Sequence, residues 1–253
     1  MVWGMILPRG FGDYWPDGDF EKDPKTGDNG WFRRLTNYYA EQTEEEQKRL
    51  FEYAVDPSLS AGKYGTYPVG KFKKEPDRTR DGSGKLPYGD VEPHEVPKSF
   101  DTDKSYKSLA SLISLNSRLL AVDERLKTII ERLEPGMHEF FPFALMMPKG
   151  KPYPKQYYIL RIRQYFDAFS KESTNVGSVQ VIPAYDDVPE LIEVVATKKA
   201  LSGLAMRKEV FANAHLWRDR TFEEELTCFS DELIAEIQSE GLKLPKHYKL
   251  KVV

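Results

Sequence analysis

The sequence of 253 residues contains a single cysteine, Cys228, within the apolar run LTCF. No disulfide can form within the chain, and the apolar setting predicts a small buried core residue rather than a reactive thiol. The sequence also lacks a signal peptide and any apolar run near the roughly 20 residues that span a bilayer. We therefore expect a cytoplasmic protein that does not enter a membrane.

Motifs that carry catalytic or metal chemistry are missing as well. No two histidines have the HExxH or HxH spacing that places two imidazoles on one metal ion, and no cysteine pair could assist. No serine lies in a GxSxG turn, and no glycine-rich loop precedes a helix to hold a phosphate. The sequence therefore predicts no metal site, no cofactor and no catalytic residue. The alternative is an enzyme or a small-molecule-binding protein, in which His138 or His215 would lie in a pocket beside buried carboxylates.

Neither sign of charge is in large excess. The chain has 37 lysine and arginine residues and 40 acidic residues, which gives a net charge of −3. Non-specific nucleic-acid binding draws most of its affinity from clustered lysine and arginine, so this balance argues against it. Hydrophobic residues make up 40% of the chain and charged residues 30%. This composition predicts a soluble globular protein with a substantial core.

Residues 1–105 are rich in aromatic and turn-forming residues, and we expect them to pack irregularly on the rest of the chain. The turn formers at 17–18 and 28–30 are expected to join short strands. Thr43, at the start of TEEEQKRLFEYAV, predicts the N-terminus of a helix with one apolar face.

Residues 57–104 contain many prolines and glycines. Because proline removes a backbone donor and blocks helices, we expect little regular structure there. Long loops of this kind are functional or mobile, and the sequence does not choose between the two. Loops on a rigid framework often carry function, so we expect this half of the chain to contribute the partner-binding surface. The aromatic candidates for partner contact are Trp15, Trp31, Phe32, Tyr64 and Tyr67.

Residues 119–143 and 225–252 follow one pattern: a short apolar run, a capped amphipathic helix, a turn and an aromatic strand-like run. Their alignment places Asp123 on Ser230, and either side chain can cap a helix. The pattern predicts the same strand–helix–strand module twice. Similar caps and apolar spacing occur in many helices, so a true duplication and a chance likeness both stay open.

The remaining elements complete the prediction of an α+β protein. Residues 106–115 have leucine and isoleucine at helical spacing and predict a short helix. Aromatic and β-branched residues predict strands at 139–145, 157–162, 179–182 and 191–197. We expect an antiparallel or mixed sheet with a few packed helices.

The run HLWRDR, residues 215–220, is the most distinctive polar cluster. Tryptophan and arginine dominate binding hot spots, so the cluster could be a recognition surface. The alternative is structural, with Trp217 in the core and Asp219 paired with an arginine. We favour the structural alternative.

Two stretches resemble a known family. The first, DERLKTIIERLEPGMHEFFPFAL followed by YYILRIRQYFDAF, has a helix that ends at Pro-Gly, an E-F-x-P strand and a tyrosine-rich strand that closes on an aspartate. The second, HLWRDRTFEEELTCFSDELIAEIQSEGLKL, has a Trp-Arg motif, a strand, and Ser-Asp-Glu-Leu at the start of the last helix. Residues 106–253 thus resemble a family of immunity proteins from bacterial polymorphic-toxin systems. The residues that carry the match are Pro135, Gly136, Glu139, Phe140, Pro142, Asp167, Trp217, Arg218, Ser230 and Asp231.

The resemblance implies a cytoplasmic protein that binds a cognate toxin, encoded by an adjacent gene, and blocks the toxin's active site without catalysis. Such work depends on surface complementarity, so catalytic motifs are not needed. It implies an α+β immunity domain over residues 106–253, with residues 1–105 packed against it. No nucleic acid and no membrane is expected as a partner. The oligomeric state stays open, with a homodimer as one alternative.

Overall fold

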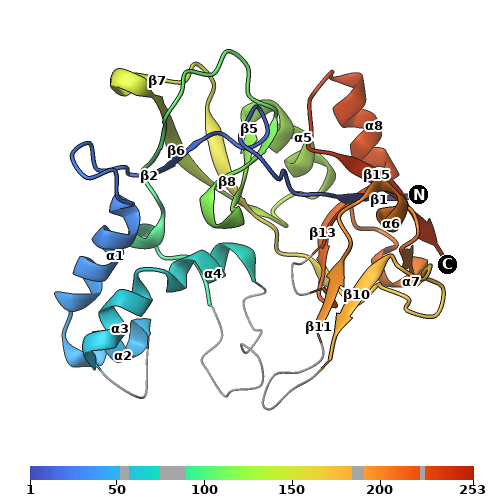
Figure 1. The fold of residues 1–253 in the computed structure, drawn as a ribbon, viewed down its shortest axis with the longest axis horizontal. Helices are drawn as coiled ribbons and strands as arrows, with labels where there is room; N and C mark the ends of the chain where they lie inside the picture. Colours follow the sequence, from blue (N-terminus) through green and yellow to red (C-terminus); the bar gives the residue numbers. More distant parts are fainter. Residues whose placement is uncertain (52–56, 75–88, 184–190, 223–225) are drawn as a thin grey trace.

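The computed structural model describes residues 1–51, 57–74, 89–183, 191–222 and 226–253. Two mixed β-sheets form the body of the molecule, and helices cover their faces (Figure 1). The predicted α+β class is confirmed. Within the described part of the chain, no helix is long and apolar enough to cross a membrane.

The first sheet has the strand order β2-β3-β6-β8-β5-β4, and the short strand β7 pairs with β6. The β3–β6 pair is parallel and the other pairs are antiparallel. The first strand of the module predicted at 119–143 is confirmed as β5. The strands predicted at 139–145 and 157–162 are confirmed within two residues at each end. The bounds are β2 Gly18–Phe20, β3 Ser99–Thr102, β4 Leu112–Ser114, β5 Leu120–Asp123, β6 Glu139–Met147, β7 Lys151–Pro152 and β8 Tyr157–Arg161.

The second sheet has the strand order β12-β15-β1-β14-β13-β9. The β12–β15 and β13–β9 pairs are parallel, and the others are antiparallel. A separate two-stranded ribbon, β10–β11, contains the predicted strands at 179–182 and 191–197, the second of which ends earlier than predicted. The bounds are β1 Val2–Met5, β9 Tyr165–Phe166, β10 Val179–Ile182, β11 Leu191–Val194, β12 Ala205–Met206, β13 Leu216–Asp219, β14 Leu226–Ser230 and β15 His247–Val252.

Several helices begin where a side chain satisfies a free backbone N–H group. Asp123 accepts a hydrogen bond from the N–H of Leu126, and Ser230 accepts one from the N–H of Leu233, so both predicted caps are confirmed. Asn29 caps α1 in the same way. The bounds are α1 Gly30–Ala40, α2 Glu44–Leu50, α3 Pro57–Tyr64, α4 Tyr67–Lys73, α5 Glu124–Leu133, α6 Lys198–Leu201, α7 Lys208–Phe211 and α8 Asp231–Ser239.

The repeated pattern is wider in the structure than in the sequence. Five neighbouring strands of each sheet are arranged in the same way. In both sets the first pair is parallel and the next three are antiparallel; the sets are β3-β6-β8-β5-β4 of the first sheet and β12-β15-β1-β14-β13 of the second. When Asp123 is placed on Ser230, every strand pair also has the same register. Such agreement indicates a structural duplication, whose units we call the first and second repeats. Equivalent pairs are Asp123–Tyr157 and Ser230–Val2, Val122–Leu112 and Phe229–Leu216, and Leu145–Phe100 and Val252–Met206.

The two central strands occupy different places in the chain. β8 lies between β5 and β6, and it follows them in the chain. Its equivalent, β1, lies between β14 and β15 but precedes both of them in the chain. The second repeat thus takes its central strand from the N-terminal segment. The N- and C-termini consequently lie close together (Figure 1).

Helices pack against both faces of both sheets. α5 and α8 pack against each other, and one core joins them to the inner faces of the two sheets. α1, α3 and α4 cover the outer face of the first sheet through Trp31, Tyr64 and Phe72. α6 and α7 cover the outer face of the second sheet through residues such as Leu201 and Phe211.

The N-terminal position of β1 predicts that a circular permutant will fold. A chain that begins at Gly10, continues to Val253, and returns through a linker to Met1–Arg9 would copy the β6-to-β8 connection. Val253 and Met1 are equivalent to Met146 and Gln156, so the linker is matched in length to residues 147–155. We expect the permutant's free energy of unfolding to stay within about 2 kcal/mol of the wild type, because neighbouring termini tolerate such joining. Urea denaturation followed by circular dichroism measures this value. The control lacks residues 1–9 altogether; a permutant no more stable than this control would contradict the equivalence of β1 and β8.

Four predictions about secondary structure were wrong, wholly or in part. Residues 106–115 are not a helix: residues 112–114 form β4, because pairing with β5 buries their apolar side chains. Residues 28–30 do not join strands but start α1, and Pro57–Tyr64 is helical despite its proline, which stands at the helix start. The helix predicted from Thr43 ends at Leu50. Its predicted continuation over 52–55 lies outside the described residues, and so does part of the segment expected to have little regular structure, residues 75–88.

The boundary predicted between residues 105 and 106 runs through both sheets. β1, β2 and β3 precede this boundary in the chain. β1 pairs with β14 and β15, and β3 pairs with β6, and these three partner strands follow the boundary. β2 pairs with β3 at the edge of the first sheet. Residues before this boundary therefore supply strands to both sheets.

Candidate functional site

A groove runs between the two repeats, with a volume of about 860 Å³. Ser114 and Leu120 of the first repeat line it, and so do Arg218 and Thr227, which form the equivalent pair in the second repeat. The segment after β1 crosses the groove, with Leu7 and Arg9 in its wall. The groove therefore lies at the junction of the duplicated units, a common place for binding sites.

An aromatic loop, residues 11–15, borders this groove. Gly12 and Trp15 exchange backbone hydrogen bonds of 2.8 and 3.2 Å, which close a tight turn. The carbonyl oxygens of Asp13 and Tyr14 accept from N–H groups of the segment that contains β4. Phe11 is 56% exposed and Tyr14 is 37% exposed. Rigid, exposed aromatic side chains lose little conformational freedom on binding, so this loop is suited to partner contact.

A strained turn forms another part of the groove wall. Ser117 and Arg118 both have left-handed backbone conformations, with φ of 57° and 60°. The side-chain amide of Asn116 donates to the carbonyl oxygen of Gly18 at 2.8 Å and holds the turn on the first sheet. Non-glycine residues in this conformation cost free energy and gather at functional sites. The turn leaves both side chains exposed at the groove.

The structure separates the five aromatic residues predicted to contact a partner. Trp15 lines the groove and packs on Phe11, with ring centroids 4.7 Å apart. Phe32 and Tyr67 are half-buried against the helical core. Trp31 and Tyr64 are fully buried, so a partner cannot reach them in the folded protein, and their assignment is wrong. They hold α1 and α3 on the first sheet instead.

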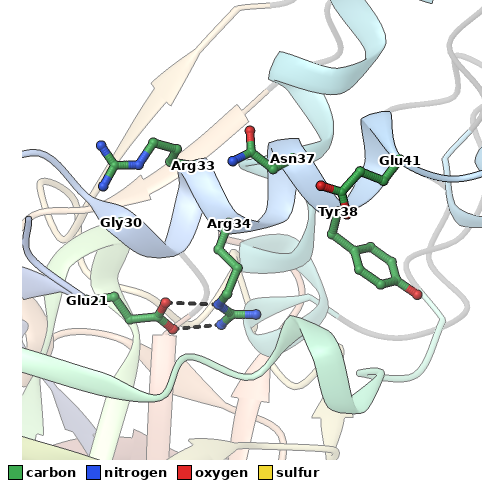
Figure 2. A pocket seen from close by; sticks show the side chains of 7 residues that line it. All are labelled: Glu21, Gly30, Arg33, Arg34, Asn37, Tyr38 and Glu41. Atoms are coloured by element: carbon green, nitrogen blue, oxygen red, sulfur yellow. Dashed lines mark hydrogen bonds and ion pairs between the residues drawn. The ribbon is translucent and has the colours of Figure 1, made fainter.

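A shallower depression of about 480 Å³ lies on α1 (Figure 2). Arg34 points from the helix toward Glu21 and makes two hydrogen bonds with its carboxylate, at 2.9 and 2.7 Å. Arg34 also donates to the carbonyl oxygens of His94 and Val96. Burial would raise the pKa of Glu21, but its bonds with Arg34 and the Lys98 backbone hold the pKa below the usual value. Arg34 and Glu21 therefore stabilise the fold at this depression.

Two buried polar networks bear on the alternative of an enzyme. The Glu134 carboxylate accepts hydrogen bonds from His138, Gln164 and the backbone N–H groups of His215 and Leu216. Burial would raise the pKa of Glu134, but these hydrogen bonds outweigh it and lower the pKa. His138 and a buried carboxylate thus meet, as the enzyme alternative requires. They do so at a closed junction between α5 and β13, and they line neither cavity described above.

The second network lies under the helices α1–α4. Glu95 accepts from Nζ of Lys71 at 2.6 and 2.9 Å and from the hydroxyl of Tyr64 at 3.0 Å. Burial, followed by the charge of Glu95, raises the pKa of Tyr64, so the hydroxyl stays a donor. His94 stacks on Tyr38, and its Nε2 lies 2.7 Å from the Tyr64 hydroxyl, so His94 belongs to this network.

The HLWRDR cluster is structural. Trp217 is fully buried and stacks on Phe211, with ring centroids 4.8 Å apart. Asp219 was expected to pair with an arginine, but its carboxylate accepts from the backbone N–H groups of Ala168 and Phe169 at 2.9 and 3.0 Å. Burial raises its pKa despite these bonds. The carboxylate therefore anchors the loop that follows β9.

The other framework residues have contacts that maintain the fold. Gly136, with φ of 68°, turns the chain after α5, next to the exposed Pro135. Glu139 binds Arg161 and Arg163, and Asp231 accepts from the indole N–H of Trp3. The remaining contacts are Phe140 with Lys127, Pro142 opposite Tyr158 in the first sheet, Asp167 with Arg220, Arg218 with the carbonyl oxygen of Lys73, and Ser230 with the N–H of Leu233.

Sequence reasoning missed four residues at the groove and its border: Arg9, Phe11, Tyr14 and Arg118. Phe11 and Tyr14 share the aromatic run that contains Trp15, but only the turn at Gly12 shows which rings are exposed. Nothing in the sequence marks the conformation of Arg118. Among the residues that the structure describes, no group of three or more His, Cys, Asp or Glu side chains could hold a metal ion.

Comparisons with known proteins agree with the resemblance in the sequence. A search of curated proteins gives no significant match. A family model, described as the immunity protein family Imm11, matches residues 41–250. This match begins well before residue 106, where the resemblance in the sequence was taken to start, and includes the helices α2, α3 and α4. Because it covers most of the chain, the protein belongs to the Imm11 immunity protein family.

Proposed function

We propose that this protein neutralises a cognate toxin by binding it with the groove and the aromatic loop, so that the toxin's active site is blocked. The toxin is expected from an adjacent gene, and the complex is expected to form in the cytoplasm without any reaction. Membership of an immunity protein family supports an immunity role and a toxin partner. The observation that carries the proposal further is the rigid aromatic loop, exposed beside the largest groove described.

The composition of this surface suits binding to a protein. Tryptophan, tyrosine and arginine dominate the energy of protein interfaces, and all three occur here as Trp15, Tyr14, Arg9 and Arg118. Hydrogen bonds to the β4 segment hold the loop in place before a partner arrives. A preformed surface avoids part of the entropic cost of association.

Co-expression tests the proposal. Cells that express the toxin of the adjacent open reading frame should stop growing, and co-expression of this protein should restore growth. With purified proteins, toxin activity should fall linearly with added protein and reach its minimum at a fixed molar ratio. Stoichiometric titration would be expected of a binder, whereas an enzyme that modifies the toxin would act at about a hundredth of that ratio or less.

A loop variant provides the matched comparison. Phe11→Ser with Tyr14→Ser should weaken toxin binding by about tenfold or more, because exposed aromatic anchors are removed. Arg125→Ser with Lys155→Ser, on exposed side chains away from the groove, is the control. Full protection by the loop variant at equal expression, or inhibition by catalytic amounts, would contradict the proposed binding mode.

A further inference from the structure

The ribbon β10–β11 has one edge joined to the rest of the molecule and one open edge. Ile192 of β11 forms a parallel bridge with Phe222, which is buried. Val179, Ile192 and Val194 pack one face of the ribbon on the core of the second sheet. Within the described part of the chain, β10 pairs with no strand other than β11. The ribbon is therefore held at the edge of β11 and open at the edge of β10.

The register of the ribbon shows which backbone groups lie at this open edge. Just before the ladder begins, the N–H of Val195 donates to the carbonyl oxygen of Ser178 at 3.1 Å. Bonded and non-bonded pairs alternate in an antiparallel ladder, so Val179 and Val181 belong to the non-bonded pairs. Their N–H and C=O groups point away from β11. Among the described residues, none makes a hydrogen bond to these groups.

Other edge strands have such groups covered by the chain itself. In β4, the N–H of Ser114 donates to the carbonyl oxygen of Tyr14 at 2.8 Å. In β12, the carbonyl oxygen of Ala205 accepts from the N–H of Ser170 at 2.8 Å. β10 has the sequence VQVI, without a charged residue or a proline. Edge strands that lack such protection pair readily with another chain, and a third strand also stabilises a two-stranded ribbon.

Backbone pairing defines the occupant of this edge as an extended polypeptide, since such a chain repeats donors and acceptors at the spacing of a strand. Val181 is 37% exposed and lies on the same face of the ribbon as Val179. Apolar residues at alternate positions of an added strand would cover it. Glu193 and Val194 of β11 line the groove, so the ribbon adjoins the surface assigned to the toxin.

We propose that β10 receives an extended strand of the toxin. The N–H groups of Val179 and Val181 donate to carbonyl oxygens of that strand, and their own carbonyl oxygens accept from its N–H groups. Apolar side chains of the toxin strand pack beside Val181. This inference rests on the proposed function and names the form of the toxin segment that is recognised.

A proline at the open edge tests the inference, with the catalytically inactivated toxin of the adjacent open reading frame as the probe. Val181→Pro removes the outward N–H and leaves the bonds between β10 and β11 in place, because Val181 makes none of them. It should weaken binding by about tenfold or more. The matched control, Val181→Ala, keeps the N–H and should weaken binding by about threefold or less. Unfolding curves that match the wild type show that both variants are folded.

Hydrogen exchange of the wild type tests the same edge without a substitution. In the protein alone, the amides of Val179 and Val181 should exchange faster than that of Gln180, which is bonded to β11. In the complex, the Val179 and Val181 amides should exchange at least about tenfold more slowly.

The outcomes separate this inference from the proposed function. If the wild type binds and neutralises the toxin while exchange at Val179 and Val181 stays unchanged, the edge assignment is overturned and the proposed function stands. Equal binding by Val181→Pro and Val181→Ala would also overturn the edge assignment. Protection of the two amides in the protein alone, rising with its concentration, would assign the edge to a second copy of this chain. Failure of the wild type to bind would overturn the proposed function itself.

Discussion

Replacement of Glu134 by alanine is expected to lower the free energy of unfolding by about 3–5 kcal/mol, because it leaves several buried donors without an acceptor. The carboxylate joins the end of α5 to the start of β13, and so connects the two repeats. Glu134→Gln keeps one acceptor oxygen, so its free energy of unfolding should fall by less, about 1–2 kcal/mol. Urea denaturation at pH 7 measures both values.

The pH dependence provides a second test of the same carboxylate. The pKa of Glu134 in the folded protein lies below its ordinary value of 4.5, so the unfolded chain takes up the proton first as pH falls. Stability from this group is complete above pH 4.5 and is lost as pH falls through the folded pKa. In Glu134→Gln the part of the pH dependence of stability that comes from Glu134 should disappear.

The control for both tests is Glu131→Ala on the exposed face of α5, where a pair with Lys127 is worth little. It should change stability by less than about 0.5 kcal/mol. If Glu134→Ala costs no more than Glu131→Ala, the Glu134 network does not hold the repeats together.

The second large effect is expected at Lys71. Lys71→Met leaves the carboxylate of Glu95 buried and unpaired, and should cost about 3–5 kcal/mol. Combining it with Glu95→Gln should restore part of that stability, because the buried charge is then removed. The double variant should therefore unfold at a higher urea concentration than Lys71→Met alone.

Arg49→Ala serves as the matched control, since Arg49 pairs with Glu46 and Glu92 but is largely exposed. Its cost should stay below about 1 kcal/mol. A double variant less stable than Lys71→Met would show that Lys71 contributes through packing of its carbon chain and not by neutralising Glu95.

Local signals were sufficient for the elements in the repeated module. Asp123 and Ser230 each precede an apolar helical pattern, and both cap the helix that the sequence predicts. The helix predicted at residues 106–115 was wrong because local signals were not sufficient there. Their leucines and isoleucines have helical spacing, but β4 is buried on both faces, so pairing with β5 decides their conformation. Tertiary pairing of this kind leaves no period in the sequence.

The site was less predictable than the fold. Aromatic residues in the N-terminal region were proposed as a group, but the structure buries Trp31 and exposes Phe11, and this difference depends on α1, which the sequence did not predict. The groove joins the segment after β1 to the turn at Arg118 and to β13. Residues so distant in the chain meet only because β1 pairs with β14 and β15 in the second sheet, and sequence spacing carries no sign of that pairing.

The position of β1 also determines when the protein can be finished during synthesis. β1 leaves the ribosome long before its neighbours β14 and β15 are made. Until those strands are made, both edges of β1 have no partner strand and are open to wrong pairing. The groove takes Met5 from β1 and Leu226 from β14. A chain interrupted before β14 would therefore lack both neighbours of β1 and part of the groove wall.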